Sequence, residues 1–205
     1  MKMLRERKTA VLLTVAIAAV ATLIGVYASL RRLTRDVEDM FYSGVYIEDQ
    51  KYTEPSIYER LKDSAQAALN LATLLKNRPE LADEAEALLS AQRWIHDAKS
   101  ISALSEADAK MAAAFTDLLE SAKKSELTVR EIEAIRIHQA SFSGAHLSIA
   151  DSAYNEKTEQ YSRDVSLIAK LISIVLPVKP PQRFMSNAAP IIWVFQTDSV
   201  QGGVH

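Results

Sequence analysis

The side chains that could do chemistry in this chain are few and scattered. There is no cysteine, which excludes disulfides, thiolate metal sites and cysteine nucleophiles. His138 and His146 lie eight residues apart, too far to share a metal ion without ligands from elsewhere, and no His-Glu-x-x-His motif occurs. We therefore expect each histidine to be paired or to face solvent: His96, His138, His146 and His205.

The acidic and hydroxyl side chains do not complete a site either. The Glu-x-x-His pairs of a di-iron bundle are absent, so the carboxylate groups are read as solvated helix faces: Glu131, Glu133, Asp83, Glu84 and Glu86. Ser141 and Ser143 precede His146, yet there is no Gly-x-Ser-x-Gly motif and no glycine-rich phosphate loop. The sequence predicts no catalytic residue, no metal ion and no cofactor, and we expect the protein not to be an enzyme.

Composition and charge narrow the class of protein. The 205 residues include only 5 glycines and 6 prolines, and alanine, leucine, glutamate and lysine are abundant, which favours helices. The formal net charge of −2 combines a basic stretch at residues 1–8 with a mildly acidic remainder. A mildly acidic body argues against nucleic acid, whose phosphates require a basic face.

An uncharged run at residues 9–30, TAVLLTVAIAAVATLIGVYASL, predicts a membrane anchor. As a helix it would be about 33 Å long, against a hydrocarbon core of about 30 Å. A cleaved signal peptide is the alternative, because Val26 and Ala28 satisfy the small-residue rule for cleavage after Ala28. The run is longer than the apolar region of most signals, so an uncleaved anchor is favoured, with the lipid bilayer as its partner.

The charges beside this run give a weak prediction of orientation. Lys2, Arg5, Arg7 and Lys8 precede it, and three cationic side chains follow it closely: Arg31, Arg32 and Arg35. The positive-inside tendency then places the N-terminus in the cytoplasm and the body outside, in a single-pass membrane protein.

Helix signals recur along the rest of the chain. The first helix should continue to about Tyr42 and loosen at Gly44. Ser56 with Glu59 forms a capping-box pattern that opens a second helix, and a third should span about 79–98. A fourth should begin near Ser105, with Ser105 and Asp108 as its cap.

The longest helix is predicted to open at Thr128 with Glu131, another capping box, and to run to about Val175. In its first half, one apolar stripe should face the core: Val129, Ile132, Ile135, Phe142, Ala145 and Ile149. Gly144 would let another helix approach closely. No segment shows convincing strand alternation, with residues 191–195 as the one doubtful case.

These signals predict an all-α protein, with an N-terminal transmembrane helix followed by an elongated antiparallel helical bundle. The expected parts are a basic flank at 1–8, an anchor at 9–30, a juxtamembrane neck at 31–54, a helical bundle at 55–177 and a proline-containing tail at 178–205.

Two tyrosines in the last predicted helix stand seven residues apart, which is two helical turns. Tyr154 and Tyr161 therefore share a face that should point inward, with each hydroxyl finding a partner. Asn155 beside the first could hydrogen-bond to a neighbouring helix and fix its register.

The same residues resemble a known family. Ala153-Tyr154-Asn155, then Tyr161, Pro177 and the ending Lys179-Pro180-Pro181-Gln182-Arg183-Phe184, together with the N-terminal anchor, resemble the LemA family of bacterial membrane proteins over residues 9–184. The resemblance implies a bundle of long helices held at a membrane. It supplies no enzymatic chemistry, so the family-motif residues enter as fold determinants: Tyr154, Asn155, Tyr161, Pro177, Lys179, Pro180 and Phe184.

The tail carries an apolar patch that offers an interaction site: Ile191, Ile192, Trp193 and Phe195. Folding of this patch back onto the bundle is the alternative. We predict a non-enzymatic scaffold or interaction module of the cell envelope, with an unidentified protein partner and surfaces that would allow self-association. A small-ligand sensor that signals through a partner is the second hypothesis, and a metal-dependent enzyme is the third.

Overall fold

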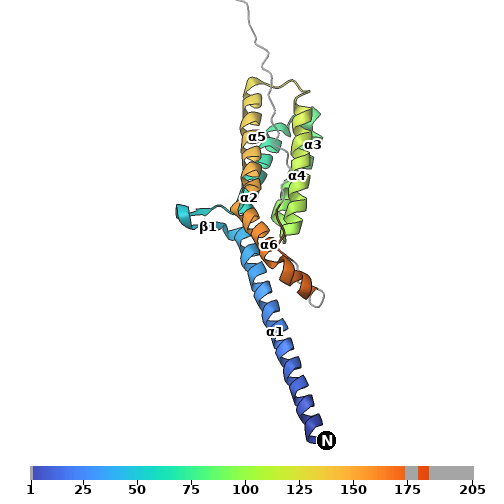
Figure 1. The fold of residues 1–205 in the computed structure, drawn as a ribbon. Coiled ribbons are helices and arrows are strands. Elements are labelled where there is room, and N and C mark those ends of the chain that lie inside the picture. The colour runs from blue at the N-terminus through green and yellow to red at the C-terminus, as the bar shows by residue number, and fades with distance from the viewer. Residues whose placement is uncertain (1, 174–179, 185–205) are drawn as a thin grey trace, which may run out of the picture. The chain divides into compact units, whose positions relative to one another are not determined.

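Helices make up most of the chain, which confirms the predicted class. The computed structural model describes residues 2–173 and 180–184, in the order α1, β1, β2, α2, α3, α4, α5, α6 with two short 3₁₀ turns (Figure 1). The chain divides into two compact units. The first, the anchor unit, comprises residues 1–54 and 153–183. The second comprises residues 55–152 together with Phe184 and is called the four-helix unit here.

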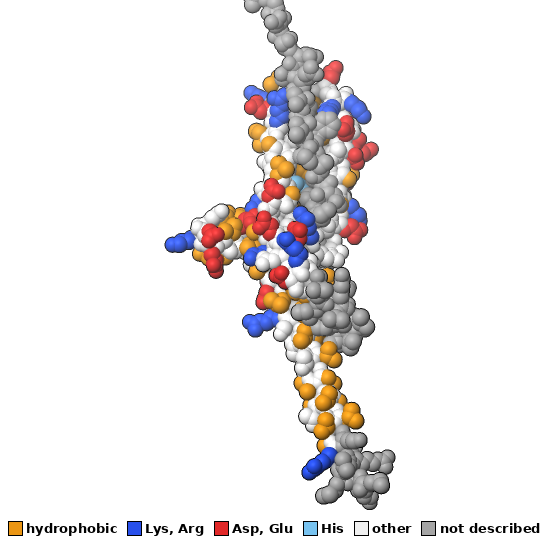
Figure 2. Space-filling model, in the orientation of Figure 1, with side chains coloured by type: hydrophobic (Ala, Val, Ile, Leu, Met, Phe, Trp, Pro, Cys, Tyr) orange, Lys and Arg blue, Asp and Glu red, His pale blue; other side chains and the backbone are white. Residues whose placement is uncertain are grey.

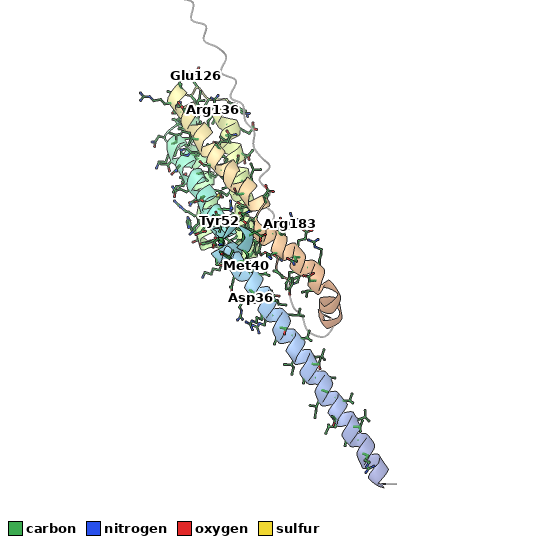
Figure 3. All side chains as sticks on the ribbon, turned by 60° about the vertical axis from the view of Figure 1, so that its left-hand side comes forward. Asp36, Met40, Tyr52, Glu126, Arg136 and Arg183 are labelled. Carbon is green, nitrogen blue, oxygen red and sulfur yellow. The ribbon has the colours of Figure 1, made fainter. Side chains whose placement is uncertain are left out.

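In the anchor unit, α1 runs without a break from Lys2 to Ser43. Its apolar part is long and apolar enough to cross a membrane, with a mean hydropathy of 2.4 and none of that window buried. A signal sequence passes the same test. Figure 2 shows apolar side chains of α1 at the surface, and Figure 3 shows side chains projecting from this part of the helix. The helix ends where expected, at Gly44, whose φ of 84° suits glycine.

A small β-hairpin follows α1, and the sequence did not predict it. Strands β1 (Val45–Ile47) and β2 (Tyr52–Glu54) pair antiparallel, with Tyr46 opposite Thr53. A 3₁₀ turn at Glu48–Gln50 joins them, and Lys51 adopts the left-handed conformation with a φ of 47°. Tyr52, labelled in Figure 3, remains half exposed. The hairpin reverses the chain so that Glu54 returns toward the anchor unit's second helix, α6 (Ala153–Ser173).

The four-helix unit contains α2 (Ile57–Leu75), α3 (Ala82–Asp97), α4 (Ile101–Ala122) and α5 (Val129–Ala150). Consecutive helices run antiparallel, with α2 packed on α5 and α3, and α3 packed on α4 (Figure 1). Both predicted capping boxes are present, Ser56 with Glu59 and Thr128 with Glu131. The stripes that these helices bury form the core, whose fully buried side chains include Leu61, Leu71, Leu88, Ile95, Phe115 and Phe142.

Three helix predictions are wrong. The fourth helix begins at Ile101 and is capped by Ser100 rather than by Ser105. Asp108, the expected partner of Ser105 in the cap, is instead a buried side chain within the helix. The helix that opens at Thr128 ends at Ala150, and α6 starts after a break at Asp151 and Ser152. The longest described helix is instead α1.

Two side-chain predictions for α5 are also wrong. Val129 is 80% exposed rather than part of the core. Gly144 faces open space, since a Cβ built there meets nothing within 4 Å, so it marks no close helix approach.

Arg78 joins two loops of the four-helix unit. Its Nε and Nη2 donate to the two carboxylate oxygens of Glu131 at 2.9 and 2.7 Å, and its Nη1 donates to the backbone carbonyl of Glu126 at 2.9 Å. This fork-to-fork pair ties the α2–α3 connection to the start of α5. The hydrogen bonds from Arg78, followed by those from Thr128, lower the pKa of Glu131 from 4.5 to about 2.

This lowered pKa predicts how acid affects stability. The Glu131 carboxylate favours the folded state above its ordinary pKa, and that contribution is lost as the pH falls from 4.5 toward 2. A Glu131→Gln variant should have a lower thermal midpoint than the parent at pH 7, and the difference should shrink across that pH range. Glu133→Gln, at an exposed neighbouring position, is the control. A difference that does not change with pH would contradict the assignment.

Candidate functional site

The anchor unit is held together by a seam between α1 and α6. The hydroxyl groups of Thr34 and Tyr161 lie 2.7 Å apart in a buried hydrogen bond. Two helical turns along, the rings of Phe41 and Tyr154 meet edge to face with centroids 5.5 Å apart. Between these two contacts, the position on α1 advances by seven residues and the position on α6 goes back by seven. The two helices therefore run antiparallel and in register.

The same register continues through the intervening buried residues. On α1 the buried positions Leu30, Thr34, Val37 and Phe41 follow the spacing 4, 3, 4, and so do Tyr154, Thr158, Tyr161 and Val165 on α6. Alternating steps of three and four are typical of helices that pack with knobs in holes. The polar Thr34–Tyr161 layer favours this register, because slipping either helix would bury a hydroxyl without a partner.

Tyr154 is the centre of further contacts in the anchor unit. Its ring is fully buried, and its hydroxyl donates to the backbone carbonyl of Gln182 at 2.9 Å. Burial raises the pKa of Tyr154 to about 12. One residue earlier, the backbone N–H of Ala153 donates to the carboxylate of Glu54 at 3.0 Å, so the hairpin delivers an anion to the N-terminus of α6.

The remaining family-motif residues are only partly described. Asn155 and Phe184 are buried, and Pro180 is exposed. Pro177 and Lys179 lie outside the described residues. So does the predicted interaction patch: Ile191, Ile192, Trp193 and Phe195.

The core of the four-helix unit contains an acid–histidine pair that the sequence did not predict. Asp108 on α4 and His146 on α5 are 1% and 3% exposed. The Nε2 atom of His146 lies 2.9 Å from Oδ1 of Asp108, and its Nδ1 lies 2.8 Å from the backbone carbonyl of Phe142. Phe142 in turn stacks on Phe115 with ring centroids 3.9 Å apart. The other oxygen of Asp108, Oδ2, is buried and has no hydrogen-bond partner among the described residues.

This geometry limits what the pair can do. A carbonyl oxygen only accepts, so Nδ1 of His146 donates to Phe142, and Nε2 forms its hydrogen bond with the Asp108 carboxyl group. Ser143, one turn earlier on α5, has a buried hydroxyl with no partner in the part of the chain that the structure describes. Both ring nitrogens are already engaged, so His146 cannot accept a proton from Ser143 as the base of a serine–histidine–aspartate triad does.

Metal coordination finds no support in the described part of the chain. Among residues 2–173 and 180–184, no three histidine, aspartate or glutamate side chains gather closely enough to hold a metal ion.

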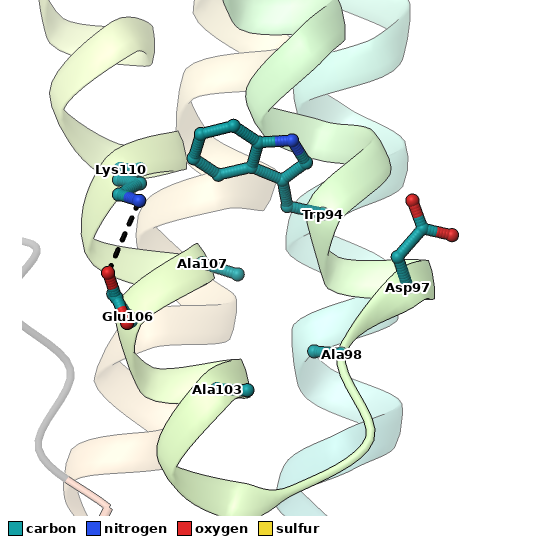
Figure 4. A pocket seen from close by; sticks show the side chains of 7 residues that line it. All are labelled: Trp94, Asp97, Ala98, Ala103, Glu106, Ala107 and Lys110. Carbon is teal, nitrogen blue, oxygen red and sulfur yellow. Dashed lines mark ion pairs between the residues drawn. The ribbon is translucent and has the colours of Figure 1, made fainter.

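A small pocket of about 250 Å³ opens between α3 and α4 (Figure 4). The indole of Trp94 is half exposed there, and the ammonium group of Lys110 lies 4.2 Å from its ring centroid. Lys110 also pairs with Glu106 at 3.2 Å. Ligand sites usually enclose about 300–1,000 Å³, so this open pocket is small for a metabolite.

A second hollow lies along α5. The α5 groove, with a volume of about 450 Å³, is lined by Val129, Ile132, Glu133, Arg136, Ile137 and Ala140. The spacing of these residues, alternating steps of three and one, places them on one face of the helix. The opposite stripe, which includes Ile135, Phe142 and Ile149, faces the core. The second apolar stripe is visible in the sequence, but assigning Val129 to the core stripe concealed it.

Comparison with known proteins gives no assignment. No family model, no curated protein and no solved structure matches the chain.

The seam makes a testable prediction about stability. Thr34→Val should cost about 1–3 kcal/mol, because it leaves the buried Tyr161 hydroxyl without a partner. Tyr161→Phe should cost less, since a helical threonine can donate to the carbonyl four residues earlier. The double variant should be no less stable than Thr34→Val alone. Urea unfolding of the full chain in detergent measures these differences, with exposed Ser162→Ala as the control, and additive costs would contradict the contact.

The Asp108–His146 pair predicts a larger effect. Asp108→Ala should cost about 3–5 kcal/mol, because one partner of a buried polar pair is removed. Replacing both residues with apolar side chains, Asp108→Leu with His146→Met, should recover most of that loss. The measurement is again urea unfolding. A single substitution as costly as the double one would show that packing volume, rather than the pair, sets the stability.

Proposed function

We propose that this protein is a membrane-anchored, non-enzymatic scaffold or interaction module of the bacterial cell envelope, with α1 as an uncleaved span. The observation that carries the proposal is the continuity of α1. Its first part is apolar and exposed, and its last part, from Leu30 to Phe41, supplies half of the α1–α6 seam.

The polar groups in the apolar part of α1 are compatible with lipid. The hydroxyls of Thr14 and Thr22 donate to the carbonyls of Ala10 and Ala18, at 2.9 and 2.8 Å. A spanning segment must satisfy its polar groups internally, since the hydrocarbon core offers no water. The apolar side chains project all round the helix, as expected for a segment surrounded by lipid rather than by protein.

The seam also favours an anchor over a cleaved signal. Cleavage after Ala28 would leave Leu30 as the second residue of its helix. The first turn of a helix lacks intrahelical acceptors for its N–H groups and frays. The layer formed by Leu30 and Val165 would then be weakened at its edge. Retaining residues 1–28 keeps this layer inside a continuous helix.

We further propose that the chain is a divergent LemA-family protein. The support is the motif quoted above, together with the burial of Tyr154, Asn155 and Tyr161, which fits the role of fold determinants that the resemblance implies. A helical bundle on a membrane helix is the architecture that the resemblance leads one to expect.

The interaction role rests on the surface of the four-helix unit. The Trp94 pocket presents a half-exposed indole, and tryptophan is one of the residue types that commonly anchor protein contacts. The sensor hypothesis would use the same pocket for a small ligand. Its size favours a side chain, and a shift in Trp94 fluorescence on adding a metabolite would favour the sensor.

The anchor predicts the behaviour of the protein in cells. The full chain should stay in the membrane after carbonate extraction, and its intact mass should include residues 1–28. Since the chain has no cysteine, a Lys124→Cys variant reports the side of the membrane: a membrane-impermeant maleimide should label it in intact cells. Release by carbonate with loss of residues 1–28 would contradict the anchor, and labelling only after lysis would place the body in the cytoplasm.

The interaction role is tested in the same membranes. A photo-cross-linking residue in place of Asp97, at the Trp94 pocket, should give one reproducible protein adduct, and Trp94→Ala should abolish it. The same probe in place of Gln66, on exposed α2, is the control. Adducts of equal yield at both sites would contradict a specific docking surface.

A further inference from the structure

Three arginines stand directly after the apolar part of α1: Arg31, Arg32 and Arg35. All three are exposed, and none of them forms an ion pair or a side-chain hydrogen bond with another residue in the described ranges. A single exposed cation without a partner is ordinary on a protein surface. Three within five residues, next to a segment long and apolar enough to cross a membrane, point to an anionic partner outside the chain.

The arginines lie on the side of α1 that faces away from the α1–α6 seam. Successive residues of a helix are rotated by about 100°. The buried seam residues Leu30 and Thr34 are therefore about 40° apart, whereas the three arginines lie about 100–200° from Leu30. Their guanidinium groups remain available because α6 packs against the other side of the helix.

The position of the arginines along α1 corresponds to the lipid headgroup layer. At 1.5 Å per residue, the Cα atoms of Arg31 and Arg35 lie about 1.5 and 7.5 Å beyond Leu30, the last residue of the apolar run. The headgroup layer on each side of the hydrocarbon core is about 5–8 Å thick. Since α1 is one unbroken helix through this region, the helix itself sets this spacing.

The charges on α1 change sign just beyond this layer. Asp36, labelled in Figure 3, is followed by Glu38 and Asp39, and all three are exposed. They begin about 9 Å beyond the apolar run, on the side of the headgroup layer away from the hydrocarbon core. This order, cations at the headgroups and anions outside them, is complementary to a layer of negatively charged phosphates.

The neighbouring helix does not cancel the positive charge. Tyr161 lies opposite Thr34, so the antiparallel register places Arg163 and Asp164 of α6 at the level of the arginines. Their charges offset each other. The arginines of α1 therefore set the sign of the charge at headgroup level in the anchor unit.

We propose that Arg31, Arg32 and Arg35 bind the phosphate groups of anionic phospholipids at the surface of the membrane that α1 crosses. The proposal rests on the membrane anchor proposed above. A planar guanidinium group donates parallel hydrogen bonds to phosphate oxygens, and an anionic lipid surface attracts cations close to it. This contact would enrich anionic lipids around the anchor unit and hold Leu30 at the boundary of the hydrocarbon core.

Short-range quenching beside the arginines tests this lipid preference. The chain has no cysteine, so a Leu33→Cys variant, at a half-exposed position among them, takes a single bimane label. The full chain is placed in phosphatidylcholine vesicles that contain a fixed fraction of either phosphatidylglycerol or phosphatidylcholine with a nitroxide quencher on the same acyl carbon. Phosphatidylglycerol should be enriched about two- to fivefold beside the label, the range that an exposed ion pair provides, and should quench more strongly.

The readout is local to the arginines. Lys8, the nearest cation on the other side of the apolar run, is about 38 Å away along α1, beyond the contact range of the quencher. Replacing all three arginines with glutamine should equalise quenching by the two lipids. Replacing them with lysine should retain most of the difference, because the charge is kept.

The matched control removes three exposed cations from the four-helix unit: Lys76→Gln, Lys124→Gln and Arg130→Gln. These changes alter the net charge equally and should leave the lipid preference unchanged. Raising the salt concentration should weaken the preference of the parent chain, because exposed ion pairs are screened.

The outcomes separate this proposal from the anchor on which it rests. Equal quenching by the two lipids in the parent chain would overturn the lipid contact while leaving the anchor in place, and so would a preference that survives the glutamine variant. Quenching by neither lipid would contradict the anchor, and the proposal with it. A preference abolished by inorganic phosphate, but not by chloride at the same ionic strength, would assign the arginines to free phosphate and also overturn the proposal.

Discussion

The buried hydrogen bond between Thr34 and Tyr161 sets the constraint on which the anchor unit depends. It joins side chains separated by 127 residues in sequence and fixes the antiparallel register of α1 and α6. With that register set, Phe41 meets Tyr154, and Glu54 comes close enough to bond the N-terminus of α6. The β-hairpin reverses the chain direction after α1 and so brings Glu54 to α6. In the sequence, the four-helix unit lies between β2 and α6. The first and last described helices, α1 and α6, pair with each other.

The four-helix unit has its own organisation. Short loops connect its antiparallel helices, which bury their apolar stripes against one another. Arg78 holds two of these loops together through Glu131. The Asp108–His146 pair is the unusual part of its core, because both ring nitrogens are bonded while one carboxylate oxygen has no partner among residues 2–173 and 180–184. Such a pair is costly to break and contributes little net stability compared with apolar packing. It joins α4 to α5 inside the core.

Short sequence motifs correctly predicted the features that depend only on neighbouring residues, such as helix starts. The capping boxes at Ser56 and Thr128 place helix starts correctly because their hydrogen bonds lie within four residues. Ser105 with Asp108 imitates the same pattern, but Asp108 is required by His146, 38 residues away, which no local signal reveals. The break after Ala150 has neither proline nor glycine, and three-residue strands are too short to alternate visibly. Tyr154 and Tyr161 were predicted to be buried with bonded hydroxyls, but their partners, Gln182 and Thr34, come from tertiary structure alone.

The account makes α1 both a membrane span and half of the seam, and one cross-linking measurement tests both roles together. Val37→Cys combined with Thr158→Cys, in a chain with an N-terminal epitope tag, would be oxidised in isolated membranes. Val37→Cys with Val165→Cys, displaced by two helical turns, is the matched control. The account predicts an intramolecular disulfide for the first pair only, in a species that remains in the membrane and retains the tag. A disulfide that forms equally well in the displaced pair, or a cross-linked species without the tag, would contradict it.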